Sequence, residues 1–146
     1  MDNKIFFLLC SSIFLIACNN KIESGETLAK TDKDYIQSLN LLDKDEKIYK
    51  FYSEYKNKIA GNFFTNKRLA KYWIDNQNKS KNEISFAYYL DIKSIDTIYN
   101  AGATYCPYLL VTKKDGSKFK VCVEGTRNDI KTFFEEALNT WKRNKQ

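Results

Sequence analysis

The sequence predicts an α+β domain, with N-terminal helices, a four-stranded antiparallel sheet and a C-terminal amphipathic helix packed on that sheet. Three observations predict this fold class. Apolar residues recur at helical spacing up to about residue 75, alternate with polar residues after residue 83, and return to helical spacing after residue 126. A chain of 146 residues has room for one such domain.

The N-terminal half of the domain predicts helices. Residues 34–42 carry an apolar stripe, either as a separate short helix or as part of the next one. Residues 43–59 place an apolar and aromatic face at spacings of three, four and seven: Ile48, Phe51, Tyr52, Tyr55 and Ile59. Gly61 ends this helix, and Thr65 caps a second one whose buried side carries Leu69, Tyr72 and Trp73.

Four extended segments are expected after a polar loop at residues 76–80, namely 84–92, 95–99, 105–112 and 117–124. The last two form a hairpin, because Asp115-Gly116 lies between two β-rich runs. The final element is a helix that begins at Thr126, with Asp129 three positions later as in a capping box. Its apolar face consists of Ile130, Phe133, Phe134, Ala137, Leu138 and Trp141.

The hairpin register follows from its apolar residues. Burying Leu109 and Val111 against Phe119 and Val121 pairs odd with odd positions, which requires a three- or five-residue loop. A three-residue loop with Gly116 in the left-handed conformation makes Cys106 and Cys122 diagonal neighbours, and a five-residue loop places them opposite each other. Either arrangement permits a disulfide between these two cysteines. The alternative is a pair of buried free thiols.

Residues 1–17 have the features of a secretory signal, since one lysine precedes an apolar run that is too short to span a bilayer. The run ends at Leu15-Ile16-Ala17-Cys18, which resembles the lipobox of bacterial lipoproteins. The resemblance implies that Cys18 is acylated and becomes the new amino terminus, and that the membrane is a partner through this lipid. We expect a flexible tether over 18–31 and the single α+β domain over 32–146, in which we recognise no specific family.

The resemblance also implies a location in the bacterial cell envelope. Asn19 directly after Cys18 resembles the pattern of lipoproteins sent to the outer membrane, facing the periplasm, if the organism is Gram-negative. In a Gram-positive organism the same protein would remain on the plasma membrane. Export also brings Cys106 and Cys122 into an oxidising compartment, where paired thiols are usually bridged.

Composition excludes several kinds of chemistry. The chain has no histidine, which rules out catalytic triads and the usual zinc and haem sites built on imidazole. The net charge of +6 comes mainly from lysine rather than arginine, a weak signal for nucleic-acid binding. We therefore expect no catalytic residue, no metal ligand, no cofactor and no nucleic-acid partner.

The candidate partner-binding residues are four lysines on the expected hairpin, Lys113, Lys114, Lys118 and Lys120. They form either a docking surface or protection of a sheet edge against unwanted pairing. The acidic residues Asp91, Asp96, Glu124 and Asp129 are the candidates for a carboxylate pair in glycoside cleavage. Solvated surface charges are the simpler interpretation of all four.

Three hypotheses of function follow. The first is a lipid-anchored envelope protein without catalytic activity that binds a protein partner, with immunity-type inhibitors of periplasmic toxins as a subclass suggested by analogy. The second is a surface-exposed lipoprotein that binds host or environmental ligands. The third is a carboxylate-dependent cell-wall hydrolase. The absence of histidine and of a paired-carboxylate motif favours the first.

Overall fold

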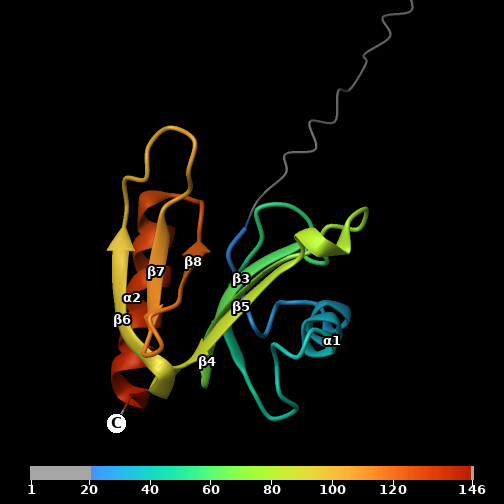
Figure 1. The fold of residues 1–146 in the computed structure, drawn as a ribbon, viewed down its shortest axis with the longest axis horizontal. Helices are drawn as coiled ribbons and strands as arrows, with labels where there is room; N and C mark the ends of the chain where they lie inside the picture. Colours follow the sequence, from blue (N-terminus) through green and yellow to red (C-terminus); the bar gives the residue numbers. More distant parts are fainter. Residues whose placement is uncertain (1–20, 146) are drawn as a thin grey trace, which may run out of the picture.

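Residues 21–145 are described by a computed structural model, in which they form two antiparallel sheets, two α-helices and two short 3₁₀ helices (Figure 1). The five-stranded sheet has the order β1-β2-β3-β4-β5, with β1 Glu23–Ser24, β2 Ile48–Tyr52, β3 Ala60–Thr65, β4 Arg68–Trp73 and β5 Glu83–Tyr88. The three-stranded sheet has the order β6-β7-β8, with β6 Ile92–Ile98, β7 Tyr108–Lys113 and β8 Lys118–Cys122. The helices are α1 Lys30–Ser38, α2 Arg127–Asn144, η1 Lys79–Lys81 and η2 Tyr89–Asp91.

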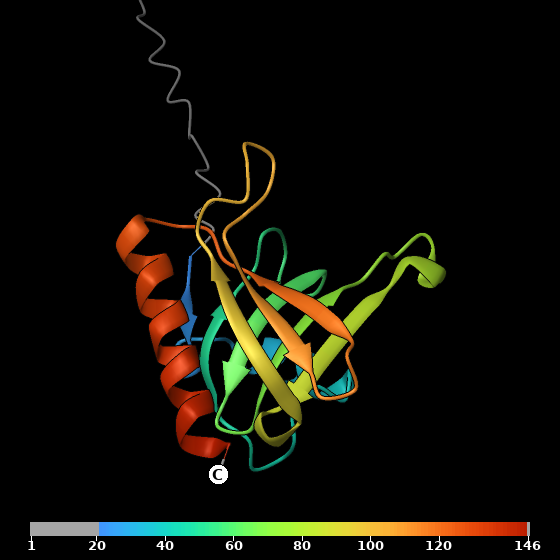
Figure 2. The same ribbon diagram turned by 60° about the vertical axis from the view of Figure 1, so that its left-hand side comes forward.

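The elements form layers. In Figure 1 the five-stranded sheet lies between α1 on one side and the three-stranded sheet with α2 on the other. Figure 2 shows α2 running along the open side between the two sheets. The fold is therefore α+β with a C-terminal helix, as predicted, but its strands form two sheets rather than one sheet of four strands.

The predicted helices at 43–59 and 65–73 are wrong, because these segments contain β2, β3 and β4. The five-stranded sheet is covered on both faces, so neighbouring residues of one strand are both buried. Phe51 faces the α1 side and Tyr52 faces the second sheet, and both are fully buried. Burial on both faces removes the apolar–polar alternation of a strand and leaves apolar spacings that also fit a helix.

The strands predicted in the second half are present, but they are divided between the sheets. The segment expected as one strand over 84–92 is interrupted by η2, which carries the chain from β5 in the first sheet to β6 in the second. β5 pairs with β4, whereas β6 pairs with β7. The alternation of residues 84–92 predicted the strand, but nothing local to that segment specified which partner it would have.

The predicted hairpin register is confirmed. Leu109 lies opposite Val121 and Val111 lies opposite Phe119, so the odd positions do pair. The Lys113 N–H donates to the Ser117 carbonyl at 2.9 Å, which closes a loop of three residues between them. Gly116 has φ +88°, the left-handed conformation that such a loop requires.

The C-terminal helix is also confirmed. Thr126 and Asp129 form the full capping box, in which each side chain accepts a hydrogen bond from the other residue's backbone N–H. Ile130, Phe133, Phe134 and Ala137 are buried between the two sheets. The Phe133 ring meets Phe64 of β3 edge to face at 5.1 Å between centroids, so α2 packs on both sheets and closes the main core.

The segment predicted as a flexible tether contributes to the domain from its first described residues onward. β1 pairs with β2, with Glu23 opposite Phe51, and Ile22 packs against the main core. Leu28 is only 2% exposed and belongs to the α1-side core. The signal at 1–17 and Cys18 lie outside the described residues. Among residues 21–145, no helix has the length and hydropathy needed to cross a bilayer.

A buried ion pair joins the segment after α1 to the five-stranded sheet. Arg68 is 1% exposed and binds Glu46 through two hydrogen bonds, from Nε to Oε1 at 2.9 Å and from Nη2 to Oε2 at 2.6 Å. Glu46 Oε1 also accepts a hydrogen bond from the Thr65 hydroxyl. Asp43 adds a second carboxylate 3.0 Å from Nη2. The site is a guanidinium held in two-point contact by a carboxylate, an arrangement that lysine cannot reproduce.

We expect Glu46→Gln to destabilise the fold by about 3–5 kcal/mol, because it leaves the buried Arg68 charge without its main partner. Urea unfolding of the purified protein measures this change. Asp43→Asn is the matched control: its carboxylate is half exposed, so solvent screens its charge and its loss should lower stability much less than Glu46→Gln does. Equal stability of the Glu46→Gln variant and the unmodified protein would contradict a structural role for the pair.

Candidate functional site

A groove runs between β5, the last strand of the five-stranded sheet, and the β7–β8 hairpin of the other sheet. It consists of two adjoining hollows of about 580 and 630 Å³. Four of their lining residues are common to both hollows: Ile84, Ser85, Lys118 and Phe119. We call this feature the β5–β8 groove.

The β5 side of the groove carries a row of exposed apolar side chains. Ile84, Phe86 and Tyr88 are 43%, 36% and 38% exposed, and their alternation places them on one face of the strand. The Phe86 and Tyr88 rings pack edge to face at 5.5 Å. The Arg68 guanidinium lies 4.5 Å from the Tyr88 ring centroid and 5.1 Å from that of Phe86. The buried ion pair therefore supports the aromatic part of this row through cation–π contacts.

The hairpin side of the groove carries the lysines predicted from the sequence. Lys113, Lys114 and Lys118 line the first hollow, and Lys118 and Lys120 line the second. Lys113 lies 3.8 Å from Asp115, while Lys114 and Lys118 make no ion pair within residues 21–145. The structure thus brings all four candidates to one wall, of which Lys114 and Lys118 are the exposed cations.

Lys120 differs from the other three lysines. Its ammonium lies 4.6 Å from the Tyr105 ring centroid and 4.5 Å from that of Tyr108. Two rings at this distance hold the cation through their faces. Lys120 therefore packs on these two tyrosines in the wall of the second hollow. The exposed charge of the groove comes from Lys114 and Lys118.

The second hollow contains residues that sequence reasoning missed. Asn62 of β3 is 3% exposed, and its amide links the two sheets. Its Nδ2 donates to Glu54 Oε2 at 2.7 Å, and its Oδ1 accepts from the Cys122 N–H at 2.9 Å. Trp73 of β4 lines the same hollow, 39% exposed. No short-range motif connects these residues, because they come from different strands and meet only when the sheets pack.

The carboxylates have separate roles. Burial raises the pKa of Glu54; its hydrogen bonds oppose this shift, and the charge of Glu124 adds to it. Glu124 accepts a hydrogen bond from the Tyr52 hydroxyl at 3.2 Å. Of the other acidic candidates, Asp129 serves the capping box of α2 and Asp91 lines the first hollow. Asp96 lies in β6 and lines neither hollow. No cluster of three or more possible metal-ligating side chains occurs within residues 21–145.

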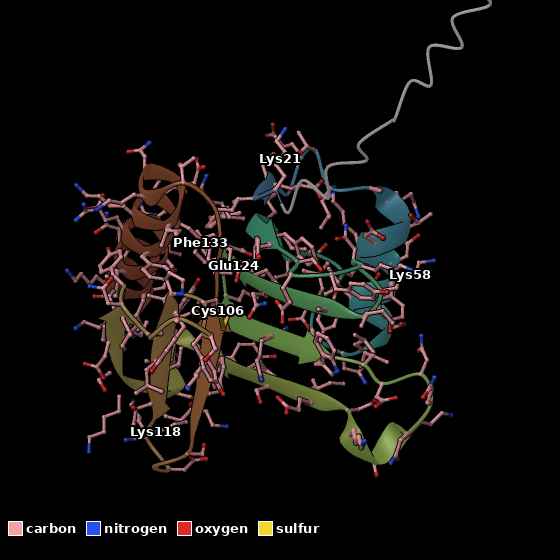
Figure 3. The ribbon with its side chains drawn as sticks, turned by 90° about the horizontal axis from the view of Figure 1, so that it is seen from above. Lys21, Lys58, Cys106, Lys118, Glu124 and Phe133 are labelled. Atoms are coloured by element: carbon pink, nitrogen blue, oxygen red, sulfur yellow. A yellow bond between two sulfur atoms is a disulfide. The ribbon has the colours of Figure 1, made fainter. Side chains whose placement is uncertain are left out.

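A disulfide joins Cys106 and Cys122, whose Cα atoms are 5.7 Å apart. The register explains how they meet. Tyr108 lies opposite Cys122, so Cys106, two residues earlier, is its diagonal neighbour, as the three-residue loop predicted. Figure 3 labels Cys106 near the middle of the view. The bridge fixes the segment before β7 to the edge of β8 that faces the second hollow.

Comparisons with known proteins identify no family for the chain. No family model matches the sequence, and the curated proteins contain no match. Among solved structures, the chain is similar to the crystal structure of a DUF1696 family protein with a pleckstrin-homology domain from Shewanella loihica. The TM-score is 0.49 and the identity 16%, over 78% of this chain and 92% of that chain. A likeness at this level carries no argument about function.

We expect the double variant Cys106→Ala/Cys122→Ala to lose roughly 3 kcal/mol of stability, because the bridge closes a loop of about 17 residues in the unfolded chain. Urea unfolding measures the loss. Reductant should lower the stability of the unmodified protein by a similar amount and leave the double variant unchanged. If reductant destabilises both proteins equally, the effect does not come from this bridge.

Proposed function

We propose that this protein is a lipid-anchored binding protein of the bacterial cell envelope, without catalytic activity, that holds a protein partner in the β5–β8 groove. The observation that carries the proposal is the composition of the groove. The β5 edge carries an exposed row of Ile84, Phe86 and Tyr88 on its α1-side face, and the hairpin across the groove presents the exposed cations Lys114 and Lys118. An apolar strip beside charges is typical of a surface that recognises another protein.

The position of the groove agrees with attachment at the amino terminus. Figure 3 shows Lys21, the first described residue, on the opposite side of the molecule from Lys118. A fully extended chain spans about 3.5 Å per residue, so a lipid on Cys18 keeps Lys21 within about 10 Å of the anchor. The groove would then face away from the membrane, toward proteins of the same compartment.

An immunity-type inhibitor of a periplasmic toxin is the subclass that best matches a small, anchored, imidazole-free binding domain. This assignment rests on analogy, and a toxin gene beside this one would support it. The alternative of a surface-exposed lipoprotein uses the same groove for a host or environmental ligand. Protease treatment of intact cells separates the two, since a periplasmic domain survives and a surface domain is cut.

The carboxylate-hydrolase alternative has one observation in its favour. Glu54 has a raised pKa, lies in the second hollow and is influenced by Glu124. Glycoside cleavage uses two carboxyl groups, one as a general acid and the other as a base or nucleophile. This alternative requires that Glu54→Gln abolish turnover of cell-wall polymer at an unchanged melting temperature.

We expect Cys18→Ser to release the protein from the membrane fraction, because it removes the sulfur that the lipobox resemblance assigns to acylation. Fractionation of cells and the mass of the mature amino terminus measure this effect. Cys10→Ser, which changes a cysteine inside the signal, is the matched control and should leave attachment intact. If Cys18→Ser leaves both attachment and maturation unchanged, the anchored part of the proposal is wrong.

We expect a photo-crosslinking amino acid in place of Tyr88 to yield a discrete adduct with one envelope protein in living cells, because Tyr88 is exposed at the β5 edge and lines the first hollow of the groove. The same amino acid in place of Lys58 is the control, since Lys58 lies far from Lys118 in Figure 3. Gel mobility and mass spectrometry identify the adduct. Adducts of equal yield at both positions, or none at Tyr88, would contradict binding in the groove.

A further inference from the structure

The β5 strand is the open edge of the five-stranded sheet. Within residues 21–145 it pairs with β4 on one side only. A strand at a sheet edge presents a row of backbone N–H and C=O groups that another extended chain can pair with. β5 also forms one wall of the groove, so any chain in the groove would lie along this edge.

Two backbone hydrogen bonds determine which groups of β5 point outward. The Tyr89 N–H donates to the Lys67 carbonyl at 3.2 Å, toward β4. The Ile74 N–H donates to the Ile59 carbonyl at 2.7 Å, toward β3. Alternation along both strands then directs odd-numbered β5 residues toward β4. The backbone groups of Ile84, Phe86 and Tyr88 therefore point away from the sheet.

The opposite wall of the groove offers less free backbone. The outward N–H of Cys122 in β8 already donates to the Asn62 side chain at 2.9 Å. This contact ties part of the β8 edge to the five-stranded sheet. An incoming strand therefore has its open pairing edge on β5.

The β5 edge lacks the usual protection against pairing. Natural sheets place lysine, proline or a bulge on exposed edges, but the run from Ile84 to Tyr88 is uncharged, and its register with β4 is regular. The charges lie across the groove instead, on Lys113, Lys114 and Lys118. An apolar edge opposite a cationic wall favours a ligand that has one apolar face and one acidic face.

The two faces follow from strand geometry. Ile84, Phe86 and Tyr88 share the face that continues the α1-side core, while Ala87 belongs to the core between the sheets. An added strand repeats this alternation, so every second side chain points toward the hairpin. Acidic side chains there would meet the lysines, and aliphatic side chains on the other face would extend the apolar row.

We propose that β5 binds an extended segment of the partner protein, in which acidic and aliphatic residues alternate, by adding it as a further strand of the sheet. This inference rests on the proposed function, because it names the chemistry of the partner in the same groove. A second copy of this chain is a poorer occupant: each copy carries a net charge of +6, and pairing two β5 edges would bring their lysine hairpins together. A nucleic-acid strand would leave the apolar row without a partner.

The test uses a fluorescent peptide of about nine residues in which Glu and Val alternate, a typical strand length. A peptide of the same composition, with the Glu and Val residues in separate blocks, is the control ligand. Fluorescence anisotropy with the purified protein should show binding of the alternating peptide, weakened by added salt. The block peptide should bind at least about tenfold more weakly, because it cannot present one acidic and one aliphatic face.

Two substitutions at one position separate backbone pairing from side-chain contact. Ile84→Pro removes an outward N–H and leaves the hydrogen bonds to β4 in place, so affinity should fall about tenfold. Ile84→Ala keeps the N–H and should cost only about threefold. Circular dichroism and melting curves check that both variants fold. Equal losses in the two variants would overturn strand addition.

A charge-matched pair of variants tests the cationic wall. Lys114→Glu/Lys118→Glu should weaken binding at least about tenfold, because the acidic face would meet like charges. Lys56→Glu/Lys58→Glu makes the same change in net charge on the loop between β2 and β3 and should have little effect. If both pairs weaken binding equally, the attraction is a property of net charge rather than of the groove.

Hydrogen exchange in the unmodified protein provides a readout that does not depend on any variant. Peptide binding should slow exchange of the Ile84, Phe86 and Tyr88 amides and leave those of Ser85 and Ala87, already bonded to β4, unchanged. Unchanged exchange at all three amides, or no binding at millimolar peptide, overturns the inference. If the protein self-associates and Ile84→Pro abolishes this, the occupant is a second copy of the chain. If oligothymidylate binds more tightly than the alternating peptide, the occupant is a nucleic acid. Either result also overturns the inference.

Failure of this inference can be distinguished from failure of the proposed function. The peptide assay uses purified protein, so its result does not depend on attachment through Cys18. A crosslinked envelope protein at Tyr88 together with no peptide binding leaves the proposed function standing and removes strand addition. Peptide binding with no envelope adduct at Tyr88 leaves strand addition standing and contradicts the proposed function.

Discussion

The buried guanidinium of Arg68 is the contact on which the rest of the structure depends. It binds Glu46 and Asp43 from the segment that follows α1. It lies in β4, the strand between β3 and the edge strand β5. The same group supports the rings of Phe86 and Tyr88 on β5. One charged side chain therefore holds the α1 layer on the sheet and orders the apolar wall of the groove. Because its charge is buried, loss of its carboxylate partner should strongly destabilise the core.

The second constraint is that the five-stranded sheet is covered unequally. The α1 layer buries one face of β2, β3 and β4 through a cluster that includes Phe51, Phe63 and Tyr72. This cover stops before β5, so the apolar row continues into solvent at the edge. On the opposite face the second sheet and α2 enclose the main core. The groove lies between this uncovered edge and the hairpin of the second sheet.

The proposed anchor and the groove together suggest a simple physical arrangement. The described chain begins on one side of the domain, and the cationic hairpin lies on the other (Figure 3). β1 and Leu28 incorporate the first described residues into the fold, which shortens the distance between anchor and domain compared with a free tether. The disulfide and Asn62 hold the hairpin wall in a fixed position relative to β3. A rigid wall of this kind reduces the entropy cost of binding an extended segment.

The sequence by itself determined the elements whose signals are local. The capping box at Thr126 and the odd-to-odd hairpin register each depend on residues close in the chain, and the register limited Cys106 and Cys122 to diagonal or opposite positions, of which the structure has the diagonal one. The positions of the four lysines in the sequence also placed them on the hairpin. Only the tertiary structure decided that residues 48–73 are strands, because burial on both faces erases the period that separates strand from helix. It also decided where the groove lies, since Asn62, Trp73 and Ile84 meet the hairpin only after the two sheets pack. Pairing between distant segments leaves no pattern in the sequence of either segment.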